Sequence, residues 1–443
     1  GAVRGRYSIL GFHPDLIWQC EGKKSEILRL KNGIVASREA CPGKSLDALR
    51  KLVNDSRMDT PPELPPMAAG VTGFMAYDMI RQVENIPDKN PDLLGVPDAV
   101  FIRPTVTAIF DNVADAIFVI TPVWPEKDIS AAQAYVAAQE RLTGIVGGLE
   151  KRSAFNSNLY PLAAQEVTFT PNMTREDYHR MVLKAKEYIA AGDIFQVVPS
   201  QRFTADFPFP PFALYRALRH LNPSPFLVYL QLPEFSLVCS SPEILVRLRD
   251  GKVTIRPIAG TRKRGKDDAE DKALAADLLA DPKEIAEHLM LLDLGRNDVG
   301  RVAKIGSVKV TERMVIEYYS HVMHIVSNVE GDIATDKDAI DALMAGFPAG
   351  TVSGAPKIRA MEIIDELEGM KRKFYAGCVG YFSGSGAMDT CITLRTGLIK
   401  NGKLHIQAGG GVVADSDPEA EYQESCNKAK ALMKAAEEAI KFG

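Results

Sequence analysis

DPKEIAEHLMLLDLGRNDVGR, at residues 281–301, predicts a helix with two carboxylates close to its beginning. Asp281 belongs to the residue types that cap helix N-termini, and Pro282 suits the first helical position because its φ is already helical. Glu284 and Glu287 follow three residues apart, which places both side chains on one face of the helix. The start of this helix therefore presents a pair of carboxylates.

A second helix start repeats this arrangement near the end of the chain. Asp417-Pro418 is followed by Glu421 and Glu424, again three residues apart. Carboxylates from two helix starts can converge on one cation, and Mg2+ prefers such oxygen ligands, completed by water and substrate oxygens. Glutamate also stabilises a helix start through the macrodipole, and Glu284 can complete a cap. From the spacing alone, a metal site and simple helix stabilisation both remain open.

Two glycine-rich turns are candidates for holding an anion. Gly409, Gly410 and Gly411 lie between a predicted strand and the second of these helices, and consecutive glycines let backbone N–H groups approach a carboxylate closely. FPAGTVSGAPK, at residues 347–357, leads into a helix predicted at 357–367, whose N-terminus attracts anions. Neither turn matches a nucleotide-binding pattern, and ordinary tight turns remain the alternative.

The rest of the chain alternates strands and helices. Residue types and apolar spacing predict strands at 7–12 and 116–121 and helices at 46–53 and 129–149. A further helix begins after Thr174, which forms a capping box with Asp177, and ends at Gly192. Residues 151–173 lack any period and are interpreted as a linker between an N-terminal region at 1–150 and a domain at 174–443.

Neighbouring strands in the second half of the chain are expected to pair antiparallel. The pairs 235–239 with 244–247 and 393–397 with 403–407 are too close in sequence for a parallel crossover. His321 and His324 fall on a strand predicted at 318–326, where a spacing of three sends them to opposite faces. The basic run RKRGK at 262–266 is followed by acidic residues, which favours an exposed loop.

The composition is that of an ordinary globular protein. Of 443 residues, 46% are hydrophobic and 25% are charged, and the net charge of −4 argues against a nucleic-acid partner. No apolar run approaches the ~20 residues that span a bilayer, and no signal peptide opens the chain, so we expect a cytoplasmic protein without a membrane partner. Six scattered cysteines without CxxC spacing predict reduced thiols, with neither a disulfide framework nor a zinc site.

Together these stretches resemble the chorismate-utilising enzymes, most closely the family of anthranilate synthase large subunits. The likeness is strongest in RPIAGTR at 256–262 and in residues 281–301, 347–357 and 407–425, and GRYS at 5–8 and PDLIW at 14–18 extend it towards the N-terminus. The resemblance implies an α+β fold in which two large, mainly antiparallel β-sheets pack as a sandwich with helices outside. It also implies that residues 174–443 are the chorismate-binding catalytic domain.

The same resemblance implies a Mg2+ site beside a substrate site. Glu287 and Glu424 match direct Mg2+ ligands, and Glu284 and Glu421 match supporting ligands, with the ring carboxylate of chorismate on the metal. Gly409, Gly410 and Gly411 match backbone donors near that carboxylate. Tyr375 and Arg395 match the residues that hold the enolpyruvyl carboxylate, for which a guanidinium fork is well suited.

A reaction is implied as well. Ammonia attacks C2 of chorismate while the C4 hydroxyl departs, and hydroxide leaves well only when an acid protonates it. Glu243 matches that acid and needs a raised pKa, His324 matches a histidine that handles protons, and Thr351 matches a hydroxyl that contacts the substrate. Loss of pyruvate and of the C2 proton then gives anthranilate, the first committed step of tryptophan biosynthesis.

Two positions separate this activity from related ones. Relatives that add water to chorismate carry a lysine where this chain has Gln196, and aminodeoxychorismate synthases carry a lysine nucleophile where it has Ala259. Direct attack by ammonia is therefore expected. Aminodeoxychorismate synthesis is the alternative, and a non-catalytic scaffold is a more remote one.

The nitrogen is expected to come from outside the chain. GCVG at 377–380 faintly resembles the cysteine elbow of a glutaminase, but it falls in a predicted strand and no suitable histidine motif follows. Use of glutamine thus requires a separate glutamine amidotransferase subunit in a hetero-oligomer, whereas free ammonia can serve the isolated chain.

Overall fold

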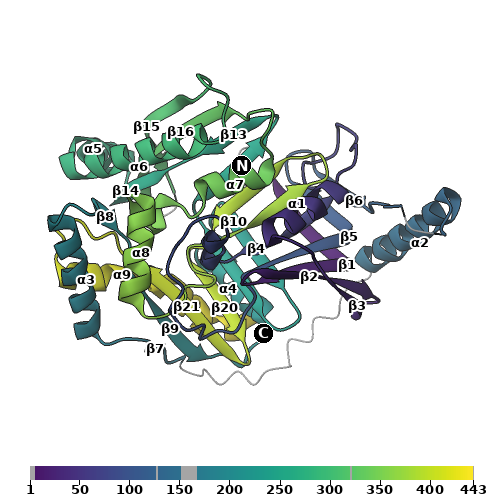
Figure 1. Ribbon diagram of the computed structural model, residues 1–443, viewed down its shortest axis with the longest axis horizontal. Helices are drawn as coiled ribbons and strands as arrows, with labels where there is room; N and C mark the ends of the chain where they lie inside the picture. The colour runs from purple at the N-terminus through teal and green to yellow at the C-terminus, as the bar shows by residue number, and fades with distance from the viewer. Residues whose placement is uncertain (1–4, 126–127, 151–166, 320–321, 443) are drawn as a thin grey trace. The chain divides into compact units, whose positions relative to one another are not determined.

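Helices and antiparallel strands make up the computed structural model of the chain (Figure 1). The structure describes residues 5–125, 128–150, 167–319 and 322–442. The chain divides into two compact units: the first contains Gly1–Met75, Pro97–Pro161 and Val379–Asp389, and the second contains Ala76–Val96, Leu162–Cys378 and Thr390–Gly443. The boundaries at 150 and 173 stay a prediction, and most of the predicted linker, residues 151–166, lies outside the described residues.

The first unit is built on a row of paired, mainly antiparallel strands. Its strands follow the order β18-β4-β5-β1-β2-β3, and β6 pairs with β5. Trp18, Phe101 and Phe382 meet in its core, with ring centroids 6.2 Å and 5.5 Å apart. The strands predicted at 7–12 and 116–121 and the helices predicted at 46–53 and 129–149 are confirmed. The elements are β1 (Tyr7–Glu21), β2 (Lys24–Lys31), β3 (Ile34–Ala40), α1 (Ser45–Asp55), β4 (Gly70–Met75), β5 (Ala99–Asp111), β6 (Ala116–Ile120), α2 (Ala131–Glu150) and β18 (Cys378–Ser383).

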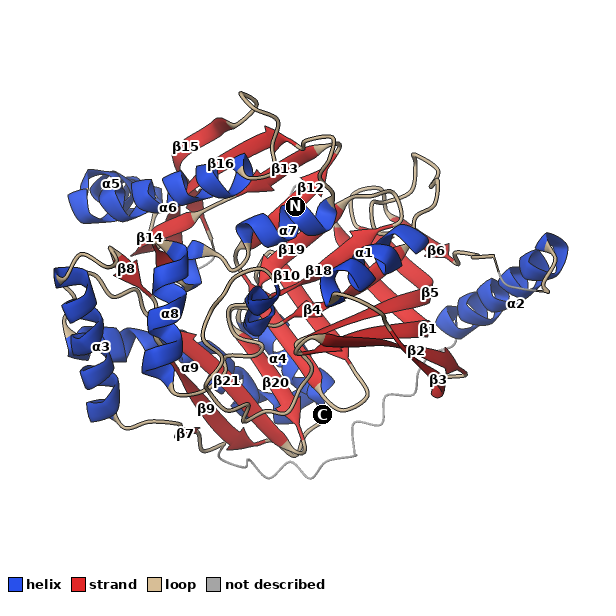
Figure 2. Cartoon of the chain, viewed as in Figure 1, coloured by secondary structure: helices blue, strands red, loops and turns tan. Residues whose placement is uncertain are grey.

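The second unit contains two large groups of paired strands (Figure 2). In one of them the order is β14-β16-β13-β12, and β15 pairs with β16. Helices α5 and α6 cover this sheet, since Leu278 and Ile285 pack with Met323 and Ile325 of β16. The elements are β12 (Ile244–Arg249), β13 (Lys252–Ile255), β14 (Ile258–Lys263), α5 (Asp268–Ala280), α6 (Pro282–Gly300), β15 (Lys309–Tyr318), β16 (Val322–Asp332) and α7 (Ala339–Gly346). Strand β19 (Met388–Ile392) carries the chain from the first unit into the second.

The other sheet of this unit follows the order β10-β11-β20-β21-β9-β7. Helices α4 and α9 cover it, because Leu218 and Leu432 are buried in one apolar cluster with Val238, Leu404 and Ile406. The elements are β7 (Thr170–Pro171), β9 (Ser200–Asp206), α4 (Pro211–Leu221), β10 (Phe226–Gln231), β11 (Ser236–Ser241), β20 (Thr396–Lys400), β21 (Lys403–Gly409) and α9 (Pro418–Glu438).

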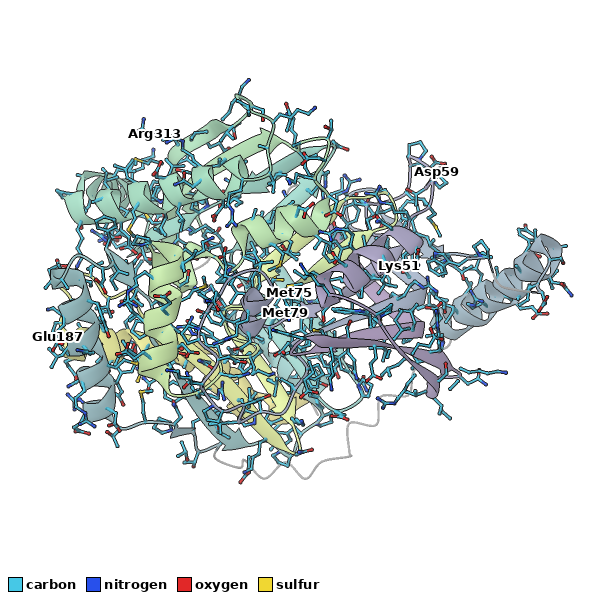
Figure 3. The ribbon with its side chains drawn as sticks, viewed as in Figure 1. Lys51, Asp59, Met75, Met79, Glu187 and Arg313 are labelled. Carbon is cyan, nitrogen blue, oxygen red and sulfur yellow. The ribbon has the colours of Figure 1, made fainter. Side chains whose placement is uncertain are left out.

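Short elements complete the second unit. They are η1 (Tyr77–Gln82), α3 (Arg175–Ala190), β8 (Gln196–Val197), η2 (Gly350–Val352), β17 (Gly354–Ala355), α8 (Lys357–Glu368) and η3 (Ala439–Phe442). Thr174 and Asp177 form the predicted capping box of α3, which buries Tyr178 and Val182. Figure 3 shows Glu187 on the outer side of α3. The helix predicted at 357–367 and the end of α3 before Gly192 are likewise confirmed.

One predicted strand pair is wrong. Strand β11 pairs with β10 and β20, whereas β12 pairs with β13, so residues 235–239 and 244–247 belong to different sheets. The short link at 242–243 is a corner by which the chain leaves one sheet for the other. The second predicted pair is confirmed as β20 with β21, although β20 begins at Thr396.

The single strand predicted at 318–326 is also wrong. Strand β15 ends at Tyr318 and β16 begins at Val322, so the segment is a hairpin in which Tyr318 lies opposite Met323. A backbone hydrogen bond from Tyr319 N–H to the Val322 carbonyl closes its end. His321 lies outside the described residues, and the prediction that it faces away from His324 lies outside them too.

The α+β class with large antiparallel sheets is confirmed. Across the described residues the six cysteines form no disulfide bond, as their scattered spacing predicts. None of the described helices combines the length and the apolar character that crossing a bilayer requires.

Candidate active site

Both helix starts predicted from the sequence are present, and both belong to the second unit. The carboxylate of Asp281 accepts hydrogen bonds from the N–H groups of Lys283 and Glu284 at the start of α6. Asp417 caps α9 by accepting from the N–H of Ala420 at 2.9 Å. A proline occupies the start of each helix, as the fixed φ of that residue favours. The capping residues therefore fix where the two helices begin, and with them the positions of the four glutamates near the helix starts.

The carboxylates of the two helices influence one another. Burial is the largest cause of the raised pKa of Glu287, and the negative charges of Glu284 and Glu424 raise it further. Burial likewise raises the pKa of Glu421, and Glu424 adds to the effect. Like charges perturb a pKa in this way only over short distances. Carboxylates from α6 and α9 therefore face one region.

Glu421 gives the clearest sign that a cation fits this region. Its Oε1 accepts a hydrogen bond from Ser416 Oγ at 2.7 Å, whereas no described group reaches its buried Oε2. A Cβ at Gly410 would lie 2.6 Å from that Oε2 and 3.7 Å from Glu424 Oε1, so only glycine leaves this space open. Hard oxygen donors, excess negative charge and an unsatisfied buried oxygen suit Mg2+.

Two of the four glutamates already face a cation of the protein. Glu284 Oε1 lies 3.1 Å from Arg262 Nη1, and Glu424 Oε1 lies 2.7 Å from Lys428 Nζ. Among the residues that the structure describes, no three His, Cys, Asp or Glu side chains are gathered closely enough to form a finished metal cluster. Ligation by Glu424 would require Lys428 to move, which its half-exposed side chain allows.

The glycine turn lies against backbone at Gly409 and against the ends of side chains at Gly410 and Gly411. Gly409 pairs with Ser200, and a Cβ at Gly409 would lie 2.2 Å from the Pro199 carbonyl oxygen. A Cβ at Gly411 would lie 2.5 Å from Gln196 Nε2. The three glycines therefore bring their backbone next to Gln196 and the α9 carboxylates, in the segment between β21 and α9 that the sequence predicts.

Glu243 and Thr351 are brought together by the fold. Thr351 Oγ1 donates a hydrogen bond of 3.1 Å to Glu243 Oε1. Burial raises the pKa of Glu243 to about 8, against the opposing effects of the Thr351 hydrogen bond, an Ile258 backbone N–H and the Arg395 charge. Glu243 is therefore protonated at neutral pH, as a general acid must be.

Arg395 and Tyr375 are both withdrawn from solvent. Arg395 has a left-handed φ of +48° between β19 and β20. Burial lowers the pKa of its guanidinium, against the favourable charges of Tyr319 and Glu243, and no ion pair of Arg395 is found among the described residues. Burial raises the pKa of Tyr375 to about 12, and the guanidinium of Arg372 lies 5.3 Å from its ring centroid. A buried cation without an anion suits a carboxylate ligand.

His324 is held in one tautomer. Its Nδ1 lies 2.9 Å from the carbonyl oxygen of Gly260, which can only accept, so Nδ1 carries the proton and Nε2 keeps its lone pair. The ring of Tyr319 meets the imidazole edge to face at 5.4 Å. Burial lowers the pKa of His324, and the positive charge of Arg395 lowers it further. The imidazole is thus neutral at pH 7 and can take up a proton.

The two positions that distinguish the related activities also lie in the second unit. Gln196, on β8, donates from Nε2 to Glu287 Oε1 at 3.2 Å, and its own Oε1 is buried without a partner among the described groups. Ala259, on β14, pairs with Ile325, and the strand bulges between Ala259 and Thr261. Neither side chain can act as a nucleophile or a base.

Sequence reasoning missed several charged residues around these groups. The exposed loop expected at 262–266 is wrong for Arg262, which lies in β14 and pairs with Asp277, Asp281 and Glu284; residues 264–266 follow the strand. Arg372 and Glu368 form a fully buried ion pair on α8 and the turn after it. An i,i+4 spacing is the only sequence signal for that pair.

Comparison with known proteins gives one consistent result. The family model described as "chorismate binding enzyme" matches residues 13–434. Anthranilate synthase component 1 of Cereibacter sphaeroides is 57% identical over 442 residues, with 100% of this chain and 88% of the relative covered. The same component of Acetivibrio thermocellus is 47% identical over 443 residues, covering 99% and 88%.

A solved structure agrees with these relatives. The crystal structure of anthranilate synthase component I from Streptococcus pneumoniae superposes with a TM-score of 0.85 at 38% identity, covering 98% of this chain and 93% of the other. The chain therefore belongs to the chorismate binding enzymes and, among them, to the anthranilate synthase component 1 family.

Proposed function

We propose that this chain converts chorismate and ammonia into anthranilate and pyruvate, in tryptophan biosynthesis in the cytoplasm. The observation that carries the proposal is Glu243, a buried carboxylic acid with a pKa of about 8 that is hydrogen bonded to Thr351 and lies near the charge of Arg395. The C4 hydroxyl of chorismate must leave as ammonia attacks C2, and its departure needs such an acid. Family membership and the absence of a lysine at Gln196 and Ala259 favour ammonia as the attacking group.

The substrate is held through its two carboxylates in this proposal. Arg395 and Tyr375 bind the enolpyruvyl carboxylate, for which Arg395 has a buried guanidinium in need of an anion. The backbone of Gly409, Gly410 and Gly411 lies close to the ring carboxylate. Glycine is required there because a Cβ would collide with neighbouring groups.

Glu287 and Glu424 would hold a Mg2+ ion directly, with Glu284 and Glu421 in support. Bound there, Mg2+ supplies Lewis-acid stabilisation of charge that develops on the ring carboxylate. The support for this site is the raised pKa values of Glu287 and Glu421 and the unpartnered Oε2 of Glu421.

Proton transfers are divided between two residues. Glu243 gives its proton to the departing C4 hydroxyl, with Thr351 holding the carboxyl group in place through the 3.1 Å hydrogen bond. His324, neutral and with a bare Nε2, accepts a proton when C2 is deprotonated and the ring becomes aromatic. Each residue thus begins the cycle in the protonation state that its step requires.

Ammonia comes from a partner. The relatives' name, component 1, implies a second component. We propose that this second component is a glutamine amidotransferase that supplies ammonia from glutamine, and that free ammonia replaces it in vitro.

The test is a reaction of the purified chain with chorismate, Mg2+ and concentrated ammonium at alkaline pH, followed by anthranilate fluorescence and mass analysis. Equal amounts of anthranilate and pyruvate, abolished by EDTA, are expected. Aminodeoxychorismate without pyruvate would move the chain to the alternative activity. If neither product forms, even with glutamine and a glutaminase subunit added, the chain is a non-catalytic scaffold.

A further inference from the structure

A small cavity borders Glu243 on the side of helix α6. It has about 30 Å³ of room for the centres of water-sized molecules. Glu243, Thr351, Gly295 and Asp298 line it, together with apolar residues such as Ile255 and Leu291. The described residues that line it include none of the groups assigned above to the substrate carboxylates or to Mg2+. Apart from Glu243 and Thr351, the described residues that line the cavity have no part in the reaction proposed above.

The cavity can hold ordered water. One water needs about 10–15 Å³ measured in this way, together with two to four polar partners. The available space thus accommodates about two waters. The carboxyl group of Glu243, the hydroxyl of Thr351 and the carboxylate of Asp298 belong to residues on its wall. Polar groups are thus present on a wall that is otherwise mainly apolar.

Asp298 connects this cavity to charged groups nearer the surface. Its Oδ2 lies 2.7 Å from Lys357 Nζ, and both side chains are about one-tenth exposed. Burial raises the pKa of Asp298 and lowers that of Lys357, with the charge of Arg301 acting on both. The Arg301 side chain is 53% exposed and lies 3.5 Å from Glu84. This charged cluster therefore extends from the buried Asp298 to the half-exposed side chain of Arg301.

We infer that Asp298 and the water in this cavity return a proton from solvent to Glu243 after each turnover. The inference rests on the proposed function, in which Glu243 has lost its proton to the departing hydroxyl. Asp298 takes a proton from solvent and releases it to a cavity water, and that water passes a proton to the Glu243 carboxylate. Only O–H bonds form and break, and the net change is the transfer of one proton from solvent to Glu243.

The relay explains how a buried acid is reset. Glu243 is 6% exposed, and its carboxyl group is enclosed by Thr351, by the Ile258 backbone and, at a distance, by the charge of Arg395. Substrate or product occupies the other approach during the cycle. A second approach lets the proton return without waiting for the site to empty.

Gly295 allows the cavity to be filled with little disturbance. A Cβ there would lie 3.5 Å from Ile255 Cγ2 and 3.9 Å from Pro257 Cδ, which are ordinary contacts with other residues of the cavity wall. Gly300 lies at the end of the same helix, and a Cβ there would meet no atom within 4 Å. Gly295→Ala therefore adds a methyl group at the cavity wall and narrows the space for water, and Gly300→Ala is its matched control.

The first turnover and the steady state are then measured separately. Because Glu243 starts protonated, Gly295→Ala is expected to leave the first turnover unchanged. We expect its steady-state rate to fall on the order of 10-fold, which is below the full ~10²–10⁴-fold contribution of positioned proton transfer, and its solvent deuterium isotope effect to increase. Gly300→Ala is expected to match the parent in its first turnover, its steady-state rate and its solvent isotope effect. An equal loss in the first and later turnovers, or no loss in either, would overturn the relay.

Asp298→Asn and the double variant Asp298→Asn with Lys357→Met test the other end of the path. The double variant removes both charges, so it avoids leaving Lys357 buried without a partner. As in Gly295→Ala, the first turnover of both variants is expected to be unchanged, whereas their steady-state rates fall. A slow first turnover in the double variant would assign the pair a structural role and contradict the relay.

A readout without turnover separates this inference from the proposed function. The carboxyl stretch of protonated Glu243, identified in infrared spectra as the band missing from Glu243→Gln, is followed after transfer into D2O. Deuterium exchange at this group is expected to be slower in Gly295→Ala than in Gly300→Ala. Equal exchange rates would refute the relay, whereas a parent chain that makes no anthranilate would refute only the proposed function.

Discussion

Thr351 Oγ1 donates a 3.1 Å hydrogen bond to Glu243 Oε1 across 108 residues of sequence. The turn that contains η2 and the corner between β11 and β12 thus meet at one carboxyl group. Hydrogen bonding to a carboxyl group of this kind favours its charged form, whereas burial favours the neutral form. Burial has the larger effect on the pKa of Glu243, so the bond positions the acid without ionising it at neutral pH.

The pH dependence of the reaction should report this bond. Glu243 acts only while protonated, so activity is expected to fall as the pH rises through about 8. Thr351→Val removes an interaction that lowers the pKa of Glu243, which shifts this fall to higher pH. Thr351→Ser keeps the hydroxyl and leaves the fall where it is. The measurement is the rate against pH at a constant concentration of free ammonia; an unchanged position of the fall in Thr351→Val would contradict this account.

Loss of the acid itself should be severe. Glu243→Gln keeps the shape of the side chain but has no proton of suitable acidity, so the rate of anthranilate formation is expected to fall ~10²–10⁴-fold. Binding of chorismate, followed by equilibrium titration, should change little because other residues hold its carboxylates. A variant with full activity would exclude Glu243 as the acid.

His324 is expected to set the fall in activity on the acidic side of the pH profile. Burial lowers its pKa below the ordinary value of 6.5, so the imidazole stays neutral down to mildly acidic pH. Activity that depends on the bare Nε2 is expected to be lost only below pH 6.5, as the ring becomes protonated. His324→Asn should lower the rate and remove this limb, which a steady-state profile from acidic to neutral pH would detect. The idea fails if the limb persists in the variant.

Binding of Mg2+ should be visible in the stability of the protein without substrate. A ligand present at 100 times its dissociation constant stabilises the folded state by ~2.7 kcal/mol, so Mg2+ is expected to raise the melting temperature. Glu421→Gln should weaken this rise, because it replaces the carboxylate whose Oε2 has no partner among the described groups. Glu419→Gln, on the same helix but paired with Arg175, is the control. Equal Mg2+ responses in the two variants would place the metal elsewhere.

The ion pair between Arg372 and Glu368 should matter for folding. Both side chains are 1% exposed, and Arg372 also donates to the carbonyl groups of Val198 and Val352. Arg372→Met leaves Glu368 as a buried charge without its partner, which is expected to cost ~3–5 kcal/mol of unfolding free energy. The double variant with Glu368→Gln should recover part of that loss. Urea unfolding decides the matter, and a double variant no more stable than the single one would show that the charges are not the cause.

The parts of the fold that the sequence predicted well depend on nearby residues. The caps of α3, α6 and α9 were predicted because the capping side chain lies within three residues of the N–H groups it satisfies. The pairing of β11 with β12 was wrong because every residue of β11 is buried. A strand buried on both faces shows no alternation that would identify its neighbours.

The sequence likewise predicted some features of the candidate site and not others. Residue types and spacing brought forward the four glutamates and the three glycines, and the family resemblance brought forward Glu243, His324, Tyr375 and Arg395. The tautomer of His324 depends on the carbonyl of Gly260, 64 residues away, and the partners of Arg262 are gathered only once α5 and α6 are folded. Such contacts follow from tertiary packing, and no local pattern encodes them.

The interleaving of the two units limits how the gene can be divided. Residues 76–96 belong to the second unit, where Asp78 accepts a hydrogen bond from the Lys373 N–H, and residues 379–389 belong to the first. A single cut in the coding sequence therefore cannot separate one whole unit from the other. Chimaeras between relatives that join two parents at one crossover between residues 76 and 389 would mix segments of both units. Exchange of a complete unit requires several crossovers, so recombination among these genes is expected to preserve the chain as one inherited block.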